Sequence, residues 1–376
     1  MDSEPTNAPG AEARPSRVIV KLGTGVLAPD PSSIRADRLQ ALGQTARALR
    51  TEGTEIILVS SGAVGLGMGK LGLVERPSSP VTLRACAAIG QNLLMDAWRA
   101  ALEPLGLLTA QVLLTREDFR SSKSSQNVKD TLDRLLEQGA VPIVNENDSV
   151  SDEEIRFGDN DVLSALLSSL CKADMLVILS TAPGLRPRPD AGEIIPFIAE
   201  ITPSIEAMAG GAGSPTSVGG MVTKIEAAKI AVKSGCAVFV GSGDDPSRLP
   251  AILAGQAAGT FFAPTGLGLN QRKKWLAFFP EPTGSLFVDQ GAANAILNEG
   301  KSLLARGLIG FEGEIARADV VAILDPAREV VARGICRFSS QELLQVQGKT
   351  NADILAFFPG RSRAEIVHRD HLAPLC

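Results

Sequence analysis

The sequence predicts an α/β layer sandwich with a mainly parallel sheet, followed by a smaller β-rich domain. Roughly the first 260 residues alternate strand-like and helix-like segments, and this alternation is typical of a sheet covered by helices. The strand-like segments are continuously apolar, as expected for parallel strands that are buried on both faces. The alternation stops near residue 270. At 376 residues, the chain exceeds the size of most single cores, so two domains are expected.

The elements of the first domain follow one another in order. The segment 17–23 ("RVIVKLG") predicts the first strand, and a helical pattern runs from about residue 33 to residue 50. Polar motifs follow several of the strand candidates, and in parallel sheets ligands bind beyond the carboxyl ends of the strands. The other strand candidates are 54–62, 108–114, 140–144, 174–180 and 237–242.

The amino-acid composition changes twice in the rest of the chain. Residues 202–220 are rich in Gly, Ser and Pro and predict a connection before a helix. After about residue 270 the strand candidates are 284–289, 320–325 and 329–338, around a short helix near 291–299. We therefore expect a disordered lead-in over 1–15, a first domain over 16–265 and a second domain over 272–370.

Composition excludes several classes of protein. No apolar run approaches 18 residues, so no membrane span is expected, and the N-terminus lacks the features of a signal peptide. The five scattered cysteines favour reduced thiols and a cytoplasmic location. Two histidines leave little for His-based catalysis, and no metal site built from protein ligands is expected. The net charge of −5 argues against a dedicated nucleic-acid binder.

Glycine-rich segments raise the question of phosphate binding. None of the three Gly-Lys dipeptides is preceded, five positions earlier, by the glycine that a P-loop requires. Gly67, Gly69 and Gly72 match a G-x-G-x-x-G pattern, but they begin several residues after their strand candidate. We therefore interpret both patterns as coincidental.

Two lysine loops fit an anion site better. Lys21 ends the first strand candidate and is followed by Gly23, whose backbone amide could face an anion. Gly219 and Gly220 precede a predicted helix that carries Lys224 in its first turn, where the helix N-terminus offers free N–H groups. Two cations that flank a moving phosphoryl group would offset its developing charge.

The stretch 145–161, "NENDSVSDEEIRFGDND", is dominated by carboxylates and carboxamides. A solvated loop, a metal cage and a site for a small polar substrate are the three interpretations. The EF-hand loop pattern finds no match in it. Together with the two lysine loops, the stretch favours phosphoryl transfer to a small polar substrate.

Seven motifs then resemble the glutamate 5-kinases, a branch of the amino-acid kinase family. They include "VIVKLGTGVL" (18–27), "LVSSGAVGLG" (58–67), "VPIVNENDSV" (141–150), "FGDNDVLSAL" (157–166) and "GGMVTKIEAAKIA" (219–231). The resemblance spans roughly residues 17–262, and the segment after 272 is similar to a PUA domain. It implies a three-layer αβα sandwich with a mainly parallel sheet, the amino-acid kinase fold, followed by a small β-rich PUA domain.

The resemblance also implies the activity and its residues. The activity is ATP-dependent phosphorylation of the γ-carboxylate of L-glutamate, the first step of proline biosynthesis, with Mg²⁺ accompanying ATP. Lys21, Lys224 and Asp161 would be catalytic, and Ser61, Asp148 and Asn160 would bind glutamate. Proline as a feedback inhibitor and a homo-oligomer are also implied. The residues expected to bind ATP are Lys21, Gly23, Ser180, Thr181, Gly219, Gly220, Met221, Thr223 and Lys224.

Two departures from the family pattern fall on the ATP side. Thr181 stands where the family usually has aspartate, and Ser217-Val218 stands where it has Gly-Thr. Nucleotide affinity or preference is therefore the property expected to differ from the family.

Three other functions are alternatives to a glutamate 5-kinase. They are a degenerate or regulatory paralogue, a related kinase of acetylglutamate, carbamate, aspartate or UMP, and an RNA-binding protein that acts through the PUA domain. The tail from residue 272 has 13 Lys and Arg against 12 Asp and Glu, which disfavours RNA binding.

Overall fold

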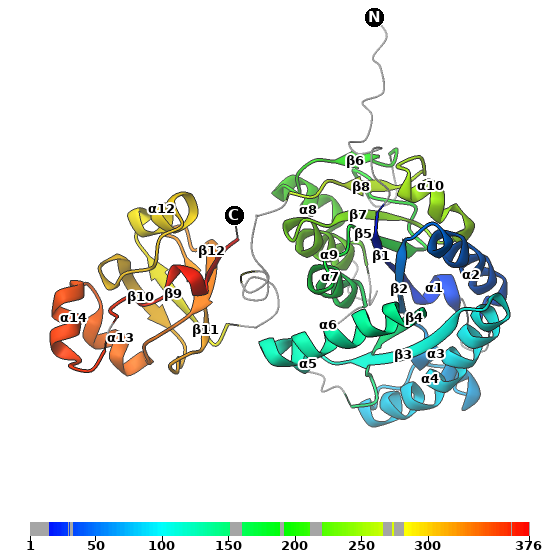
Figure 1. Ribbon diagram of the computed structural model, residues 1–376, viewed down its shortest axis with the longest axis horizontal. Helices are drawn as coiled ribbons and strands as arrows, with labels where there is room; N and C mark the ends of the chain where they lie inside the picture. Colours follow the sequence, from blue (N-terminus) through cyan, green and yellow to red (C-terminus); the bar gives the residue numbers. More distant parts are fainter. Residues whose placement is uncertain are drawn as a thin grey trace, which may run out of the picture. The chain divides into compact units, whose positions relative to one another are not determined.

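The computed structural model describes residues 15–28, 30, 33–150, 160–188, 192–210, 220–265, 273, 282–361 and 363–375. The chain divides into two compact units, Met1–Asp118 with Lys123–Gly266, and Phe119–Ser122 with Leu267–Cys376. Figure 1 shows both units with their helices and strands labelled. The predicted lead-in over 1–15 lies, except for Pro15, outside the described residues.

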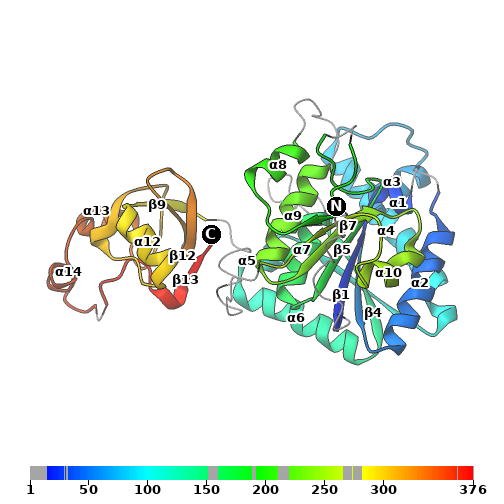
Figure 2. The same ribbon diagram turned by 90° about the horizontal axis from the view of Figure 1, so that it is seen from above.

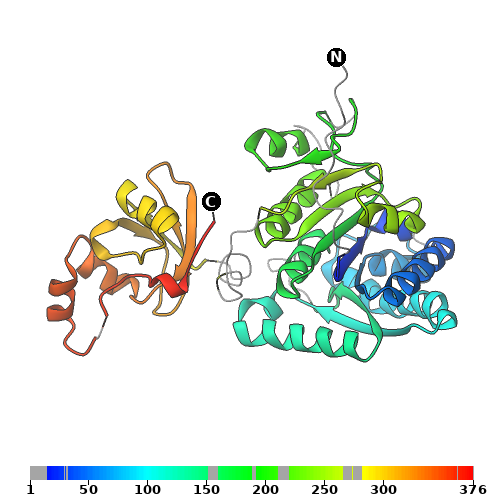
Figure 3. The same ribbon diagram turned by 45° about the horizontal axis from the view of Figure 1, so that its top comes forward.

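The first unit contains an eight-stranded sheet in the order β3-β4-β2-β1-β5-β7-β8-β6. All neighbouring strands run parallel except β7 and β8, which are antiparallel. The first strand of the chain lies in the middle of this sheet, as the dark-blue arrow in Figure 3 shows. The strands are β1 (Arg17–Leu22), β2 (Glu55–Ser60), β3 (Leu108–Leu114), β4 (Ala140–Glu146), β5 (Met175–Ser180), β6 (Phe197–Ile198), β7 (Ala237–Ser242) and β8 (Thr260–Phe262).

Helices cover both faces of the sheet and confirm the predicted three layers. Figure 2 shows α6, α7 and α9 on one side and α1, α2, α3, α4 and α10 on the other. The helices of this part of the chain are α1 (Thr24–Leu27), α2 (Ala36–Thr51), α3 (Ala63–Lys70), α4 (Pro80–Leu102), α5 (Glu117–Arg120), α6 (Ser122–Glu137), α7 (Asn160–Leu170), α8 (Pro203–Ala209), α9 (Met221–Lys233) and α10 (Leu249–Leu253).

The carboxyl ends of the central strands coincide. Leu22, near the end of β1, pairs with Ser60 at the end of β2 and with Leu179 of β5. The loops that follow these strands therefore open on the same edge of the sheet, where parallel α/β proteins bind ligands.

One expectation about the strands is wrong. The apolar sequence of β3 predicts burial on both faces, yet in β3 only Leu114 is buried, and Leu108 is 60% exposed. β3 is the edge strand, so it has a neighbour on one side only. An apolar run does not reveal whether a strand lies in the centre or at the edge of a sheet.

Gly67, the first glycine of the G-x-G-x-x-G match, lies in α3 and has a packing role. A Cβ on Gly67 would come within 1.8 Å of the Cys86 backbone oxygen, and a Cβ on Gly90 within 1.7 Å of the Ala63 backbone oxygen. The two glycines therefore let α3 and α4 approach each other with backbone in contact. Close helix packing explains Gly67, the first glycine of the match.

The second unit is a five-stranded sheet in the order β10-β9-β11-β12-β13, with α12 (Gln290–Glu299), α13 (Ser340–Val346) and α14 (Asn351–Phe357). Its strands β9 and β11 are parallel and the other neighbours antiparallel. Its hydrophobic core is separate from that of the first unit. The strands are β9 (Gly284–Val288), β10 (Leu308–Glu312), β11 (Val320–Leu324), β12 (Val330–Ile335) and β13 (Leu372–Pro374).

Candidate active site

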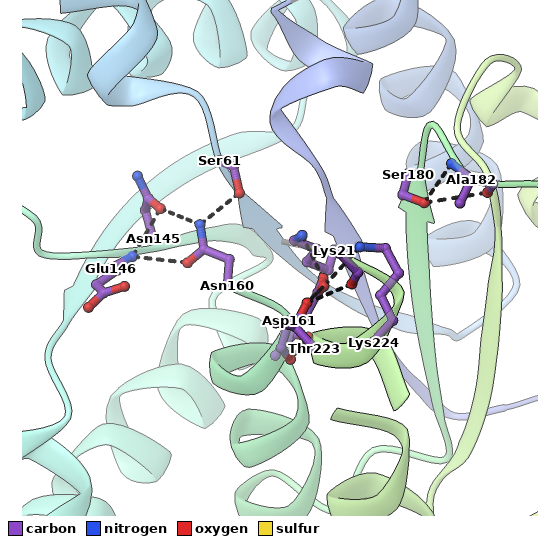
Figure 4. A network of polar contacts seen from close by, with 12 residues as sticks. Lys21, Ser61, Asn145, Glu146, Asn160, Asp161, Ser180, Ala182, Thr223 and Lys224 are labelled. Carbon is purple, nitrogen blue, oxygen red and sulfur yellow. Dashed lines mark hydrogen bonds and ion pairs between the residues drawn. The ribbon is translucent and has the colours of Figure 1, made fainter. Parts of the chain in front are cut away.

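Two lysines from opposite ends of the first unit's sequence meet on one carboxylate. Lys21 Nζ lies 2.5 Å from Asp161 Oδ1, and Lys224 Nζ lies 3.1 Å from Asp161 Oδ2 (Figure 4). Lys21 is near the end of β1, Asp161 is in the first turn of α7, and Lys224 is in the first turn of α9. We call these three residues the lysine pair and its aspartate.

All three side chains are buried. Lys21 is 3% exposed, Lys224 4% and Asp161 0%. Burial alone would raise the pKa of the Asp161 carboxyl, but Lys21 and then Lys224 outweigh it, and the pKa stays below its ordinary value. Asp161 is therefore ionised at neutral pH, and two ammonium groups share its negative charge. Such a group attracts an anion and would hold it in a low-dielectric environment.

The N-terminus of α9 adds polar groups beside the lysine pair. Gly220 is the N-cap residue of this helix, and Met221 is its first residue. The hydroxyl of Thr223 contacts Asp161 Oδ2 at 3.1 Å and donates to the Gly220 carbonyl at 2.9 Å. The first-turn N–H groups of a helix have no partner within the helix and favour anions. The chemistry of this helix end is suited to a phosphate group.

A second network begins at the neighbouring residue, Asn160. Asn160 Nδ2 donates to Ser61 Oγ at 2.8 Å and to Asn145 Oδ1 at 2.8 Å, and its Oδ1 accepts from the Glu146 backbone N–H at 3.3 Å. Figure 4 shows this network beside the lysine pair. The two adjacent residues that begin α7 therefore face two different polar clusters.

The predicted glutamate-binding residues come partly together. Ser61, in the turn after β2, and Asn160 are joined directly. Asp148 lies two residues beyond the end of β4 and is half-buried. Asn145 lies at the start of the segment 145–148 that the sequence indicated as a glutamate clamp, but it was not among the residues expected to bind glutamate. Residues 151–159, the middle of the polar stretch, lie outside the described residues.

The remaining nucleotide-side residues lie at the ends of β1 and β5. Gly23 begins the loop after β1, and its N–H donates to the Leu179 carbonyl at 2.9 Å. The expectation that this amide faces an anion is therefore wrong, because β5 already accepts its hydrogen bond. Ser180 ends β5, and its hydroxyl accepts from the Ala182 N–H at 3.1 Å. Thr181 is exposed, and a Cβ on Gly25 would come within 2.8 Å of its methyl group. Thr181 therefore lies against α1, the short helix that follows β1. Gly219, Ser217 and Val218 lie outside the described residues.

A metal cage was one of the three interpretations of the stretch 145–161, of which residues 151–159 lie outside the described residues. Within the described ranges, no group of three or more His, Cys, Asp and Glu side chains is arranged to hold a metal ion. Asp161, the central carboxylate, is engaged by the lysine pair. A divalent cation that accompanied a nucleotide would be bound in part by phosphate oxygens.

Fold and site together define a small-molecule kinase with an αβα architecture, and the chain belongs to the amino acid kinase family, whose model matches residues 16–242. A PUA domain model matches residues 284–358.

Full-length relatives narrow the assignment. Glutamate 5-kinase from Syntrophotalea carbinolica is 43% identical over 95% of this chain and 96% of its own length. The glutamate 5-kinases from Moorella thermoacetica and Myxococcus xanthus are each 42% identical over 96% of this chain and 96% of their own lengths. The resemblance to glutamate 5-kinases with a C-terminal PUA domain is thus confirmed. No helix in the described part of the chain is long and apolar enough to cross a membrane.

Proposed function

We propose that this protein transfers the γ-phosphoryl group of ATP to the γ-carboxylate of L-glutamate, forming L-glutamyl 5-phosphate and ADP. This is the first step of proline biosynthesis from glutamate. The relatives named above support the substrate, since they are glutamate 5-kinases along the whole length of the chain.

The observation that carries the proposal is the position of Asn160 and Asp161. These consecutive residues place an amide network on one side and the buried lysine pair on the other. A carboxylate held by the amide network would lie close to a phosphate held by the lysines. This juxtaposition is what a direct transfer between two bound substrates requires.

The chemistry needs no general base. The attacking carboxylate is ionised near neutral pH. Its oxygen forms a bond to the γ-phosphorus while the bond from that phosphorus to the bridging oxygen of ADP breaks, and ADP leaves with the electron pair. Lys21 and Lys224 stabilise the charge that builds up on the transferring group. Asp161 holds both ammonium groups in place before the nucleotide binds.

Mg²⁺ fits this site as a companion of the nucleotide, bound to phosphate oxygens, where it would neutralise part of their charge. The protein side of the ATP site consists, in this proposal, of the lysine pair with Gly23, Ser180, Thr181, Gly219, Gly220, Met221 and Thr223.

Ser61, Asp148 and Asn160 form the glutamate side of the proposed site. Asp148 offers a carboxylate of the right charge for the substrate ammonium group. Asn160 and Ser61 offer an amide and a hydroxyl, and their mutual hydrogen bond would rearrange to admit a substrate oxygen. Dicarboxylic amino acids are selected when both their ammonium and their carboxylates find partners.

A hydroxamate assay tests the activity. ATP and each candidate acceptor are supplied with hydroxylamine, which traps an acyl phosphate as a coloured hydroxamate. We expect turnover with L-glutamate well above that with N-acetylglutamate or aspartate, and phosphorylation of neither carbamate nor UMP in a coupled ADP assay. Absence of glutamate-dependent product with both ATP and GTP would support the degenerate paralogue instead.

The other partners follow from the same proposal. We expect a cytoplasmic homo-oligomer that is inhibited by proline. The four described cysteines are free and buried, in keeping with a reducing compartment. RNA binding by the PUA domain remains an alternative role, and salt-dependent RNA binding without ATP turnover would favour it.

A further inference from the structure

Gln91 is a buried polar residue of α4 that the mechanism above does not use. Its side chain is 7% exposed. Its Oε1 accepts a hydrogen bond from Asn145 Nδ2 at 3.0 Å. Its Nε2 is buried and has no hydrogen-bond partner among the described residues. A buried N–H donor without a partner is uncommon in folded proteins and calls for an explanation.

The orientation of the Gln91 amide follows from a backbone donor. The Glu146 N–H donates to Asn145 Oδ1 at 2.9 Å, so that oxygen must face the backbone. Asn145 Nδ2 then points the other way, toward Gln91, and needs an oxygen there. Gln91 must present Oε1 to Asn145, which leaves Nε2 as the group without a partner. If the oxygen and nitrogen of either amide were exchanged, two donors or two acceptors would face each other and a hydrogen bond would be lost.

Gln91 lies next to the proposed acceptor site. Its neighbour Gly90 packs on the backbone of Ala63, two residues beyond Ser61. Asn145 bridges Gln91 to Asn160, which in turn contacts Ser61. The amide chain Gln91–Asn145–Asn160 thus runs along the residues proposed to bind the carboxylic acid substrate. At one end its N–H groups meet Ser61, and at the other end the Gln91 N–H groups are unused.

We infer that Gln91 is a further substrate-binding residue, whose Nε2 donates a hydrogen bond to a carboxylate oxygen of the bound amino acid. The inference rests on the proposed function and adds a residue to it. A carboxylate is the acceptor that gives a buried N–H its strongest bond. The donor that is unsatisfied in the free protein is then satisfied only in the complex, so it contributes to selection of carboxylate substrates.

Two variants test this assignment. Gln91→Glu keeps an oxygen for Asn145 but replaces the donor with a second oxygen, and Gln91→Met keeps the length and removes both polar atoms. We expect the KM for L-glutamate to rise ~10- to 100-fold, because losing one charge-assisted hydrogen bond weakens binding by about this factor. The rise should be larger in Gln91→Glu than in Gln91→Met, because the new carboxylate would also repel the substrate carboxylate. The KM for ATP should stay within about twofold, since the lysine pair is unchanged.

Binding is measured independently of turnover by the rise in melting temperature that L-glutamate alone produces. We expect this rise in the wild type and in Gln44→Glu, a control on the exposed face of α2, and its loss in both Gln91 variants.

Unchanged KM values for glutamate in both variants, with a lower melting temperature, would overturn the inference and make Gln91 a packing residue. Gln91→Glu decides the question if Gln91→Met does not fold. The proposed function is tested separately by wild-type turnover, and the same comparison applies to whichever carboxylate the wild type phosphorylates.

Discussion

Each unit of the molecule contains a carboxylate held between two cations. In the first unit Asp161 lies between Lys21 and Lys224. In the second unit Glu342 lies between Arg317 and Arg361. In both groups two cations share one carboxylate, but the groups differ in their exposure to solvent and in the other contacts of their side chains.

The arginine cluster of the second unit serves the fold. Arg317 is largely exposed, at 64%, and the guanidinium of Arg361 lies 4.1 Å from the centre of the Phe338 ring. Glu342 also completes the capping box at the start of α13, where its Oε2 accepts from the Ser339 N–H at 2.9 Å. Every charge in this cluster is met by a structural partner or by solvent.

The lysine pair differs because burial removes it from solvent. Ammonium groups are compact point charges on flexible stems, suited to follow a phosphoryl group as it moves. A buried ion pair adds little net stability, because desolvation offsets the attraction. The cost of holding two buried lysines on one aspartate therefore indicates a binding role, whereas the arginine cluster indicates a structural one.

The largest expected effect is that of Asp161→Asn, which removes the charge and keeps the shape. The two buried ammonium groups would then lose the carboxylate that they share. We expect the free energy of unfolding of the first unit to fall by ~3–5 kcal/mol, together with a large loss of turnover. Denaturant unfolding and the hydroxamate assay measure the two effects. Wild-type stability in this variant would contradict the importance of the buried charge.

Glu342→Gln should have a smaller effect, confined to stability. It keeps the capping geometry and loses the ionic part of two contacts, so the second unit should lose ~1–2 kcal/mol. Turnover should be unchanged.

The pH dependence of stability sharpens this prediction. The Arg317 side chain, and the neighbouring Arg361, lower the pKa of Glu342 to about 2 from an ordinary value of 4.5. A carboxyl group whose pKa is lower in the folded state stabilises the fold at pH values above its unfolded-state pKa. The contribution of Glu342 to the stability of the second unit is therefore complete above about pH 4.5 and is lost as the pH falls toward 2. The difference in melting temperature between wild type and Glu342→Gln should shrink over that range. A constant difference would refute the assignment.

Arg317→Ala should have the smallest effect. Exposed ion pairs contribute little to stability, because solvent screens them and side-chain entropy opposes them. We expect a change in melting temperature near the limit of detection and normal kinetics. A loss of stability in Arg317→Ala as large as that in Asp161→Asn would contradict the distinction between a buried binding cluster and an exposed structural cluster.

Much of this site could be predicted because strand ends are visible in the sequence. Lys21 follows an apolar run, and β1 does end at Leu22. The parallel pattern predicted that the strand-end loops share one edge, and the lysine loops do meet there. The choice of Asp161 over the other carboxylates of its stretch came from the family resemblance, not from the pattern.

The amide network could not be predicted, because it depends on side-chain packing between distant segments. Gln91 falls within an apolar helical pattern and is separated by 54 positions from its partner Asn145. No short sequence pattern predicts a contact between these two residues. Likewise, the exposed edge position of β3 and the backbone contact of Gly67 with Cys86 follow from the sheet order and the helix packing.

The most direct test of the central claim is the turnover number of Lys224→Ala in the ATP- and glutamate-dependent hydroxamate assay. Lys229→Ala is the matched control, on the same helix, where Lys229 forms a partly exposed ion pair with Glu206. We predict that Lys224→Ala lowers kcat ~10²- to 10³-fold, as expected for the loss of one group that stabilises transition-state charge, while Lys229→Ala keeps the wild-type rate. A wild-type kcat in Lys224→Ala would contradict the claim that the lysine pair carries phosphoryl transfer.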